Sequence, residues 1–212
     1  MIFAARRSLA ALGLAVAITL GGAAALLAQE DGGTDINPDE VLASAKTNLE
    51  AKKYGKALQD LNLLVATVGK LRVESLKKTF ADAPAGWTAE DAEGNSQAAL
   101  LGVGLSVKRR YQKDPSSMDV ELTADSPMLA MIAAAFTNPA LVQGQEGKGF
   151  VTVKGRRGIL EFHKDATNGE LTFLLNNNTA MIKFTGTQVK KADLTEFAKS
   201  FDFDKMEKAL QD

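Results

Sequence analysis

The chain has 212 residues, contains no cysteine and has a single histidine, His163. Without a thiol and without a second imidazole, it can form no disulfide bond, no Cys–His catalytic pair and no multi-histidine metal site. A lipid attached to cysteine is excluded for the same reason. The stability of the fold must therefore come from a packed apolar core.

A strong charge of either sign is also missing. The formal net charge is −1, and removing Arg6 and Arg7 leaves 23 basic against 26 acidic residues, or about −3. So small a charge argues against general nucleic-acid binding. The glycines of Gly102-Val103-Gly104 precede a predicted strand and do not link a strand to a helix, so they do not indicate a phosphate loop. We expect no cofactor.

The first 28 residues have the layout of a secretory signal peptide. Arg6 and Arg7 close a basic start, residues 9–28 carry no charge, and the polar residues 29–31 follow at once. The uncharged run is also long enough to cross a bilayer, so an uncleaved anchor in the inner membrane is the alternative. Small residues near its end favour cleavage. We expect an exported protein, periplasmic or extracellular, with a linker at 29–37.

Residues 38–82 are predicted to form a helical hairpin. Asn37 suits a helix N-cap and Pro38 the first helical turn, and apolar residues then recur at helical spacing on both sides of Gly55. Residues 54–58 resemble the turn of a tetratricopeptide repeat. A single repeat cannot bury its own face. We therefore expect an ordinary hairpin that rests on the domain beside it.

Residues 83–212 are predicted to form an antiparallel sheet of about six strands packed with helices, which makes the fold class α+β. Short apolar runs are separated by turn residues at spacings of about ten, which favours a meander over parallel strands with helical crossovers. The runs are 103–111, 118–122, 150–153, 159–163, 171–175 and 181–184. Helices are expected over 126–136 and from 190 to about 210.

The segment from Met128 to Phe136 has nine successive apolar residues and no polar face. Such a helix is normally enclosed within the fold or placed against a partner. The sequence leaves both alternatives open. If the helix is a docking surface, a partner would contact Met128, Met131, Ile132 and Phe136, because methionine adapts to irregular surfaces.

Several charged residues are candidates for chemistry or binding. Alternation along the strand puts Glu161 and His163 on one face, and we interpret them as part of a solvated face, so we predict neither a catalytic group nor a metal site. A basic patch for an acidic partner is conceivable from four residues, Lys108, Arg110, Arg156 and Arg157.

Arg109 raises a different question. Strict alternation places it on the apolar face of its strand with Val107 and Tyr111, where an arginine needs a partner. It can extend past the strand end, pair with an acid such as Glu121, or be turned outward by a bulge.

The order of elements carries a resemblance. Residues 84–87 (Pro-Ala-Gly-Trp) precede the first strands, residues 153–155 (Val-Lys-Gly) form a turn, and a helix ends the chain. This resembles secreted domains of the PsbP/Mog1-like family, and the whole chain is similar to exported bacterial proteins. The resemblance implies an antiparallel sheet between helices and a role in binding or assembly.

We therefore expect a non-enzymatic binding or assembly module with a protein partner in the cell envelope. The alternatives are a membrane-tethered accessory subunit of an envelope complex and a carboxylate-dependent hydrolase.

Overall fold

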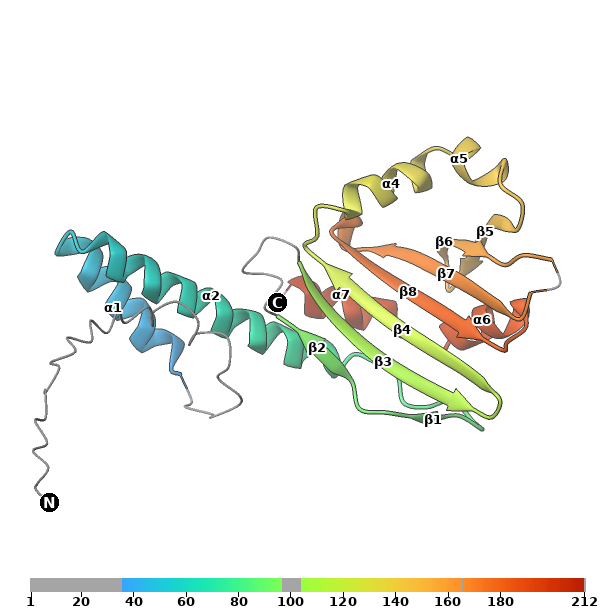
Figure 1. Cartoon of the computed structure of the whole chain (residues 1–212), viewed down its shortest axis with the longest axis horizontal. Coiled ribbons are helices and arrows are strands. Elements are labelled where there is room, and N and C mark those ends of the chain that lie inside the picture. Colours follow the sequence, from blue (N-terminus) through green and yellow to red (C-terminus); the bar gives the residue numbers. More distant parts are fainter. Residues whose placement is uncertain (1–35, 97–103, 165, 212) are drawn as a thin grey trace, which may run out of the picture. The chain divides into compact units, whose positions relative to one another are not determined.

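The computed structural model describes residues 36–96, 104–164 and 166–211. The predicted leader, most of the predicted linker and the start of the first long predicted strand lie outside the described residues. Ile36–Asp212 forms one compact unit. Its fold class is α+β, as predicted, with helices first, an antiparallel sheet next and helices at the end (Figure 1). Within the described ranges, no helix is long and apolar enough to cross a membrane.

The predicted hairpin consists of α1, Pro38–Glu50, and α2, Tyr54–Lys77. The Asn37 side chain accepts a hydrogen bond from the Asp39 backbone N–H at 3.0 Å, so it acts as the expected N-cap. The connection is short and includes Lys52, whose φ is +57°. Gly55 thus lies in the first turn of α2 and does not form the break between the helices.

Among the described residues the sheet has eight strands, and every pair of neighbours is antiparallel. The order is β1-β3-β4-β8-β7-β6-β5, and β2 also pairs with β3. The count exceeds six because β1 and β2 are too short to show alternation in the sequence. The bounds are β1 Thr88–Ala89, β2 Glu93–Asn95, β3 Leu105–Lys113, β4 Ser116–Ala124, β5 Lys148–Val153, β6 Arg156–Glu161, β7 Asn168–Leu175 and β8 Ala180–Thr187.

Two short helices, α4 (Leu129–Thr137) and α5 (Ala140–Gln143), connect β4 to β5. The helix predicted from 190 to 210 is two helices, α6 (Lys191–Ala198) and α7 (Phe203–Gln211). Its continuity was wrongly predicted because Asp202 accepts a hydrogen bond from the Lys205 backbone N–H at 3.0 Å. That bond caps a new helix start. A 3₁₀ turn, η1 (Asn176–Asn178), joins β7 to β8.

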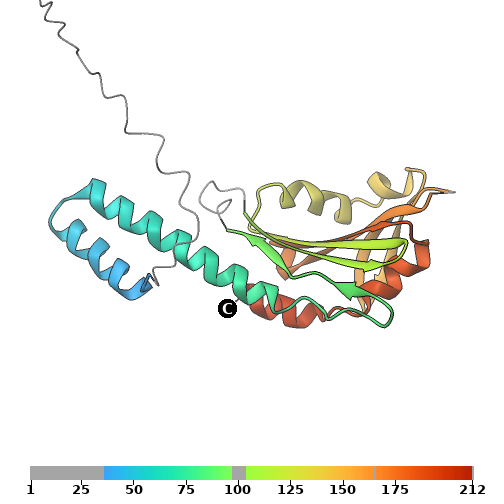
Figure 2. The ribbon, with the colours of Figure 1, turned by 60° about the horizontal axis from the view of Figure 1, so that its bottom comes forward.

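The core lies between one face of the sheet and the helices α6, α7 and the end of α2. Figure 2 shows α6 and α7 on one side of the sheet and α4 and α5 on the other. The rings of the core meet edge to face, for example Phe184 and Phe201 at 5.0 Å and Tyr111 and Phe197 at 5.0 Å. This face of the sheet is filled by the core, so it is not itself open to a ligand or partner.

Candidate functional site

The helix α4 lies on the side of the sheet opposite α6 and α7 (Figure 2). The exposure of its side chains shows that only one side of the helix is covered. Leu129 is buried, and Ile132 and Phe136 are half-buried. Met128 is 65% exposed and Met131 is 77% exposed. Of the four residues named as partner contacts, two are thus open to solvent and two are partly covered. The sequence left open whether this helix is buried or is a docking surface. In the structure one side of α4 is covered and the other side, which carries the methionines, is exposed.

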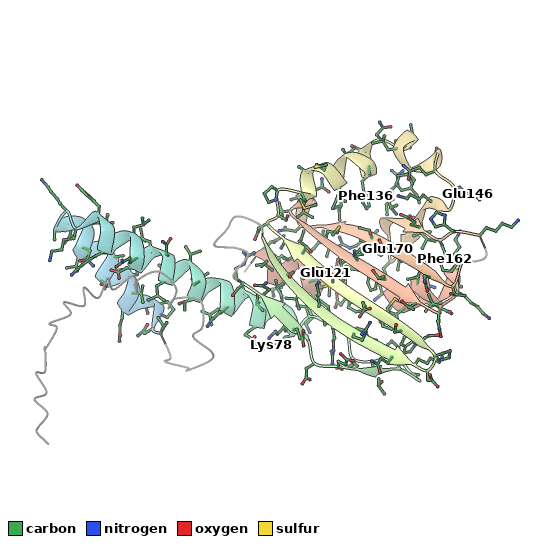
Figure 3. The ribbon with its side chains drawn as sticks, viewed as in Figure 1. Lys78, Glu121, Phe136, Glu146, Phe162 and Glu170 are labelled. Carbon is green, nitrogen blue, oxygen red and sulfur yellow. The ribbon has the colours of Figure 1, made fainter. Side chains whose placement is uncertain are left out.

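The sheet face beside α4 carries paired charges (Figure 3 labels Glu121 and Glu170 on it). Ion pairs join neighbouring strands: Arg110–Asp119 at 2.9 Å, Lys108–Glu121 at 3.4 Å, Lys183–Glu170 at 3.9 Å and Lys148–Glu161 at 2.9 Å. The Lys108 and Arg110 charges are therefore compensated by acids directly opposite on β4. Positive and negative charges are therefore balanced on this face of the sheet, which does not have the excess of positive charge that defines a basic patch.

Arg156 is the third of the four residues considered for a basic patch. Its side chain lies on the face of the sheet that α6 and α7 cover. Its guanidinium makes two hydrogen bonds of 2.7 Å to the Glu207 carboxylate and one of 2.6 Å to Asp204, both on α7. The hydrogen bond to Glu207 raises the pKa of Arg156, and the same bond holds the pKa of Glu207 below its usual range. Arg156 therefore attaches α7 to β6.

Arg157 lies on the opposite face of β6 from Arg156. Its guanidinium sits 3.5 Å from the centroid of the Phe150 ring on β5. The structure therefore brings Lys108 and Arg110 together on β3, but it separates them from Arg156 by the thickness of the sheet.

Glu161 ends β6, and His163 follows just beyond the strand. The His163 Nε2 lies 3.4 Å from Glu161 Oε1, and the imidazole side chain is 60% exposed. Lys148 binds the other carboxylate oxygen at 2.9 Å, and this hydrogen bond lowers the pKa of Glu161. The pair borders an open hollow of about 290 Å³. Among the residues that the structure describes, no three His, Asp or Glu side chains are grouped to hold a metal ion.

A second hollow, of about 400 Å³, lies where β2 and the segment before it meet β3 and β4. Its lining mixes acids and bases: Glu90, Asp91, Glu93, Lys108, Arg109, Arg110, Asp119, Glu121 and Lys183. Ligand and active-site pockets are usually enclosed and mostly apolar with a few converging polar groups. This hollow lacks that character, and we assign it no chemistry.

The Arg109 side chain adopts none of the three arrangements that the sequence suggested. Its Nε donates to the Glu90 carbonyl at 2.7 Å and its Nη1 to the Ala81 carbonyl at 3.1 Å. The Tyr111 hydroxyl donates to the same Ala81 carbonyl at 2.7 Å, and burial raises the pKa of Tyr111 to about 12. Glu121 pairs with Lys108 instead. Arg109 thus holds residues 81–90, which run from the end of α2 past β1, against the sheet.

The hairpin carries a second apolar surface, which the sequence prediction missed. Only the end of α2 rests on the sheet domain, through buried Gly69, Val73 and Leu76. Most of the remaining large apolar side chains of both helices are exposed, whereas Val41 and Leu64 are partly buried. In α2, leucine and valine recur at alternating steps of three and four residues (Leu58, Leu61, Val65 and Val68), and this spacing could have revealed the surface. It was interpreted instead as the face that packs on the neighbouring domain.

No protein-family model matches this chain, and no curated protein or solved structure matches it. The functional argument therefore depends on the surfaces described above.

Proposed function

We propose that this protein is an exported, non-enzymatic binding or assembly module of the cell envelope, whose protein partner docks on the open side of α4. The observation that carries the proposal is the exposure of Met131, 77%, on a helix with no polar residue from Met128 to Phe136. Helices that face water carry a polar stripe. Adjacent methionines that stay exposed are typical of surfaces that accommodate a partner.

The state of the carboxylates favours a module over a hydrolase. A carboxylate-dependent hydrolase needs a general acid with a raised pKa near a second carboxylate. In the described parts of the chain, the pKa values of Glu161 and Glu207 are shifted downward, each by a hydrogen-bonded cation. Asp119 and Glu121 are likewise matched by Arg110 and Lys108. This pattern suits a stable surface.

Export and location are part of the proposal and rest on residues 1–28. A cleaved leader gives a periplasmic or extracellular protein, whereas an uncleaved one gives a tethered accessory subunit in the inner membrane. The intact mass of the protein recovered from its host distinguishes them. A mass that fits a start after Ala25 or Ala28 supports release, and a mass that includes Met1 in a membrane pellet supports the tethered subunit. The PsbP/Mog1-like assignment also remains a proposal, resting on residues 84–87 and 153–155.

The docking proposal is tested with Met131→Asp in a pull-down from envelope extract. We expect the native chain to capture a protein that Met131→Asp does not capture, because docking would bury an unpaired carboxylate. Leu63→Asp is the matched control: Leu63 is 41% exposed on α2, away from α4, and should leave capture unchanged.

Thermal unfolding of both variants completes the test. Because both side chains are exposed, we expect the free energy of unfolding to change by no more than about 0.5 kcal/mol. Equal capture by Met131→Asp and the native chain would refute the docking surface. Unfolding of Met131→Asp would instead make α4 part of the core.

A further inference from the structure

Nine large apolar side chains of the hairpin are exposed by 37 to 65% of their surface, and two of them, Leu63 and Leu71, point away from the others. The other seven are Leu42 and Leu49 of α1, and Tyr54, Leu58, Leu61, Val65 and Val68 of α2. We call this set the hairpin face. Along α2 its members recur at steps of four and three residues. This is the spacing of the positions that meet a partner helix in a coiled coil.

The two helices contribute to the same side of the hairpin. They pack through Ala45 and Asn48 of α1 and Ala57 and Asp60 of α2, with Asn48 Nδ2 donating to Asp60 at 2.9 Å. At 3.6 residues per turn, the exposed residues of each helix lie about 90° onward from its packing face, in the same rotational sense. Because the helices are antiparallel, equal rotations lead to one side (Figure 1). The hairpin face is therefore continuous.

The α2 part of the hairpin face contains no charged residue. The positions that flank it on the side away from α1 are Gly55, Asn62 and Gly69, which are also uncharged. Arg72 follows the next step of the spacing, but its guanidinium is bound to Asp125 at 2.7 Å. A helix that binds a lipid surface normally carries Lys and Arg beside its apolar stripe. On α1 the outer border of the hairpin face carries Asp39, Lys46 and Glu50, which are charges of both signs and not a basic border. The uncharged border along α2 presents no like-charge repulsion to an identical surface.

We propose that a second copy of this chain covers the hairpin face, so that two hairpins form a four-helix bundle. The exposed parts of the seven side chains amount to on the order of 600 Å² per copy, and two copies would bury about 1,200 Å², the lower end of specific interfaces. Apolar residues at alternating steps of four and three form a surface that fits a partner helix. A second copy of the hairpin supplies two helices of this kind. This inference is independent of the surface on α4.

The test is sedimentation analysis of the chain as recovered from its host, with two glutamate variants. We expect a dimer for the native chain and, for Leu58→Glu, a dissociation constant raised at least about 100-fold, because pairing would bury an unpaired charge. Leu63→Glu introduces the same change on the same helix, but Leu63 points about 140° away from Leu58. It should leave the dimer intact.

Circular dichroism checks that each variant is folded, and Val65→Glu replaces Leu58→Glu if the latter does not fold. A native chain that remains monomeric at about 100 μM would overturn the proposal. A dimer that survives both Leu58→Glu and Val65→Glu would also overturn it. Because Met131 lies outside the hairpin face, Met131→Asp should remain dimeric, so failure of the α4 proposal and failure of this one give different results.

Discussion

The contact of Arg156 with α7 allows a quantitative prediction about Arg156→Ala. The two parallel hydrogen bonds between the guanidinium and the Glu207 carboxylate are both 2.7 Å, and the side chains are 25% and 24% exposed. Glu207 also accepts a hydrogen bond from the Asn176 backbone N–H at 2.9 Å. The group thus connects β6, η1 and α7.

The magnitude follows from the geometry. A hydrogen bond to a charged group contributes about 1.5–3 kcal/mol when it is well formed, and partial exposure reduces that figure through solvent screening. The Asp204 contact adds little because the Asp204 side chain is 91% exposed. We therefore expect Arg156→Ala to lower the free energy of unfolding by about 2 kcal/mol, which for a chain of this size lowers Tm by about 4–8 °C.

The loss should depend on pH in a defined direction. The folded-state pKa of Glu207 is depressed, mainly by the hydrogen bond from Arg156. Its contribution to stability is therefore fully present above the unfolded value of about 4.3 and is lost as pH falls through the folded pKa. The difference in stability between the native chain and Arg156→Ala should be constant near pH 7 and shrink below about pH 4.

Urea unfolding monitored by circular dichroism measures the free energy of unfolding at each pH, and thermal unfolding measures Tm. Arg157→Ala is the control, because the neighbouring Arg157 contacts only the exposed side of the sheet and its interaction with Phe150 is worth about 0.5–1 kcal/mol. A double-mutant cycle with Glu207→Gln isolates the pair. A change in Tm below about 1 °C for Arg156→Ala at pH 7 would refute the reasoning, since it would mean that the pair contributes nothing to the attachment of α7.

Two further substitutions test the packing of the sheet. Gly158→Ala would place a Cβ 2.6 Å from the Phe173 ring on the neighbouring strand, so we expect a loss of about 1–3 kcal/mol by urea unfolding, and unchanged stability would show that the ring moves freely. Tyr111→Phe removes the 2.7 Å hydrogen bond to the Ala81 carbonyl while Arg109 still donates to it. We expect a loss of about 0.5–1.5 kcal/mol in the same assay, and a larger loss would indicate that Arg109 alone cannot hold this segment.

Much of the fold could be predicted from the sequence because its signals are local. The Asn37-Pro38 cap, the helical spacing that follows it and the alternation of β3 and β4 depend on residues that are close in the chain. The elements that escaped prediction have other causes. β1 and β2 have two and three residues, and the break before α7 depends on a single capping side chain, Asp202.

The surfaces depended on the tertiary structure. An all-apolar helix such as α4 has no periodicity that distinguishes a covered side from an open one, so only its place on the sheet separates Leu129 from Met131. The 4-3 spacing in α2 likewise predicts an apolar face but does not say which neighbour covers it. In the fold, the sheet domain reaches only the end of that helix.

The charged residues show the same division between local and distant information. From the sequence alone, Lys108, Arg110, Arg156 and Arg157 could be considered one basic patch, because charge and exposure are all that the local pattern reveals. The acid that neutralises Arg156, Glu207, is 51 residues away in the chain. The sequence by itself determined the longer elements and the apolar stripes, since these follow from neighbouring residues. Only the tertiary structure decided which charges are paired and which stripes stay open, because both depend on contacts between distant segments.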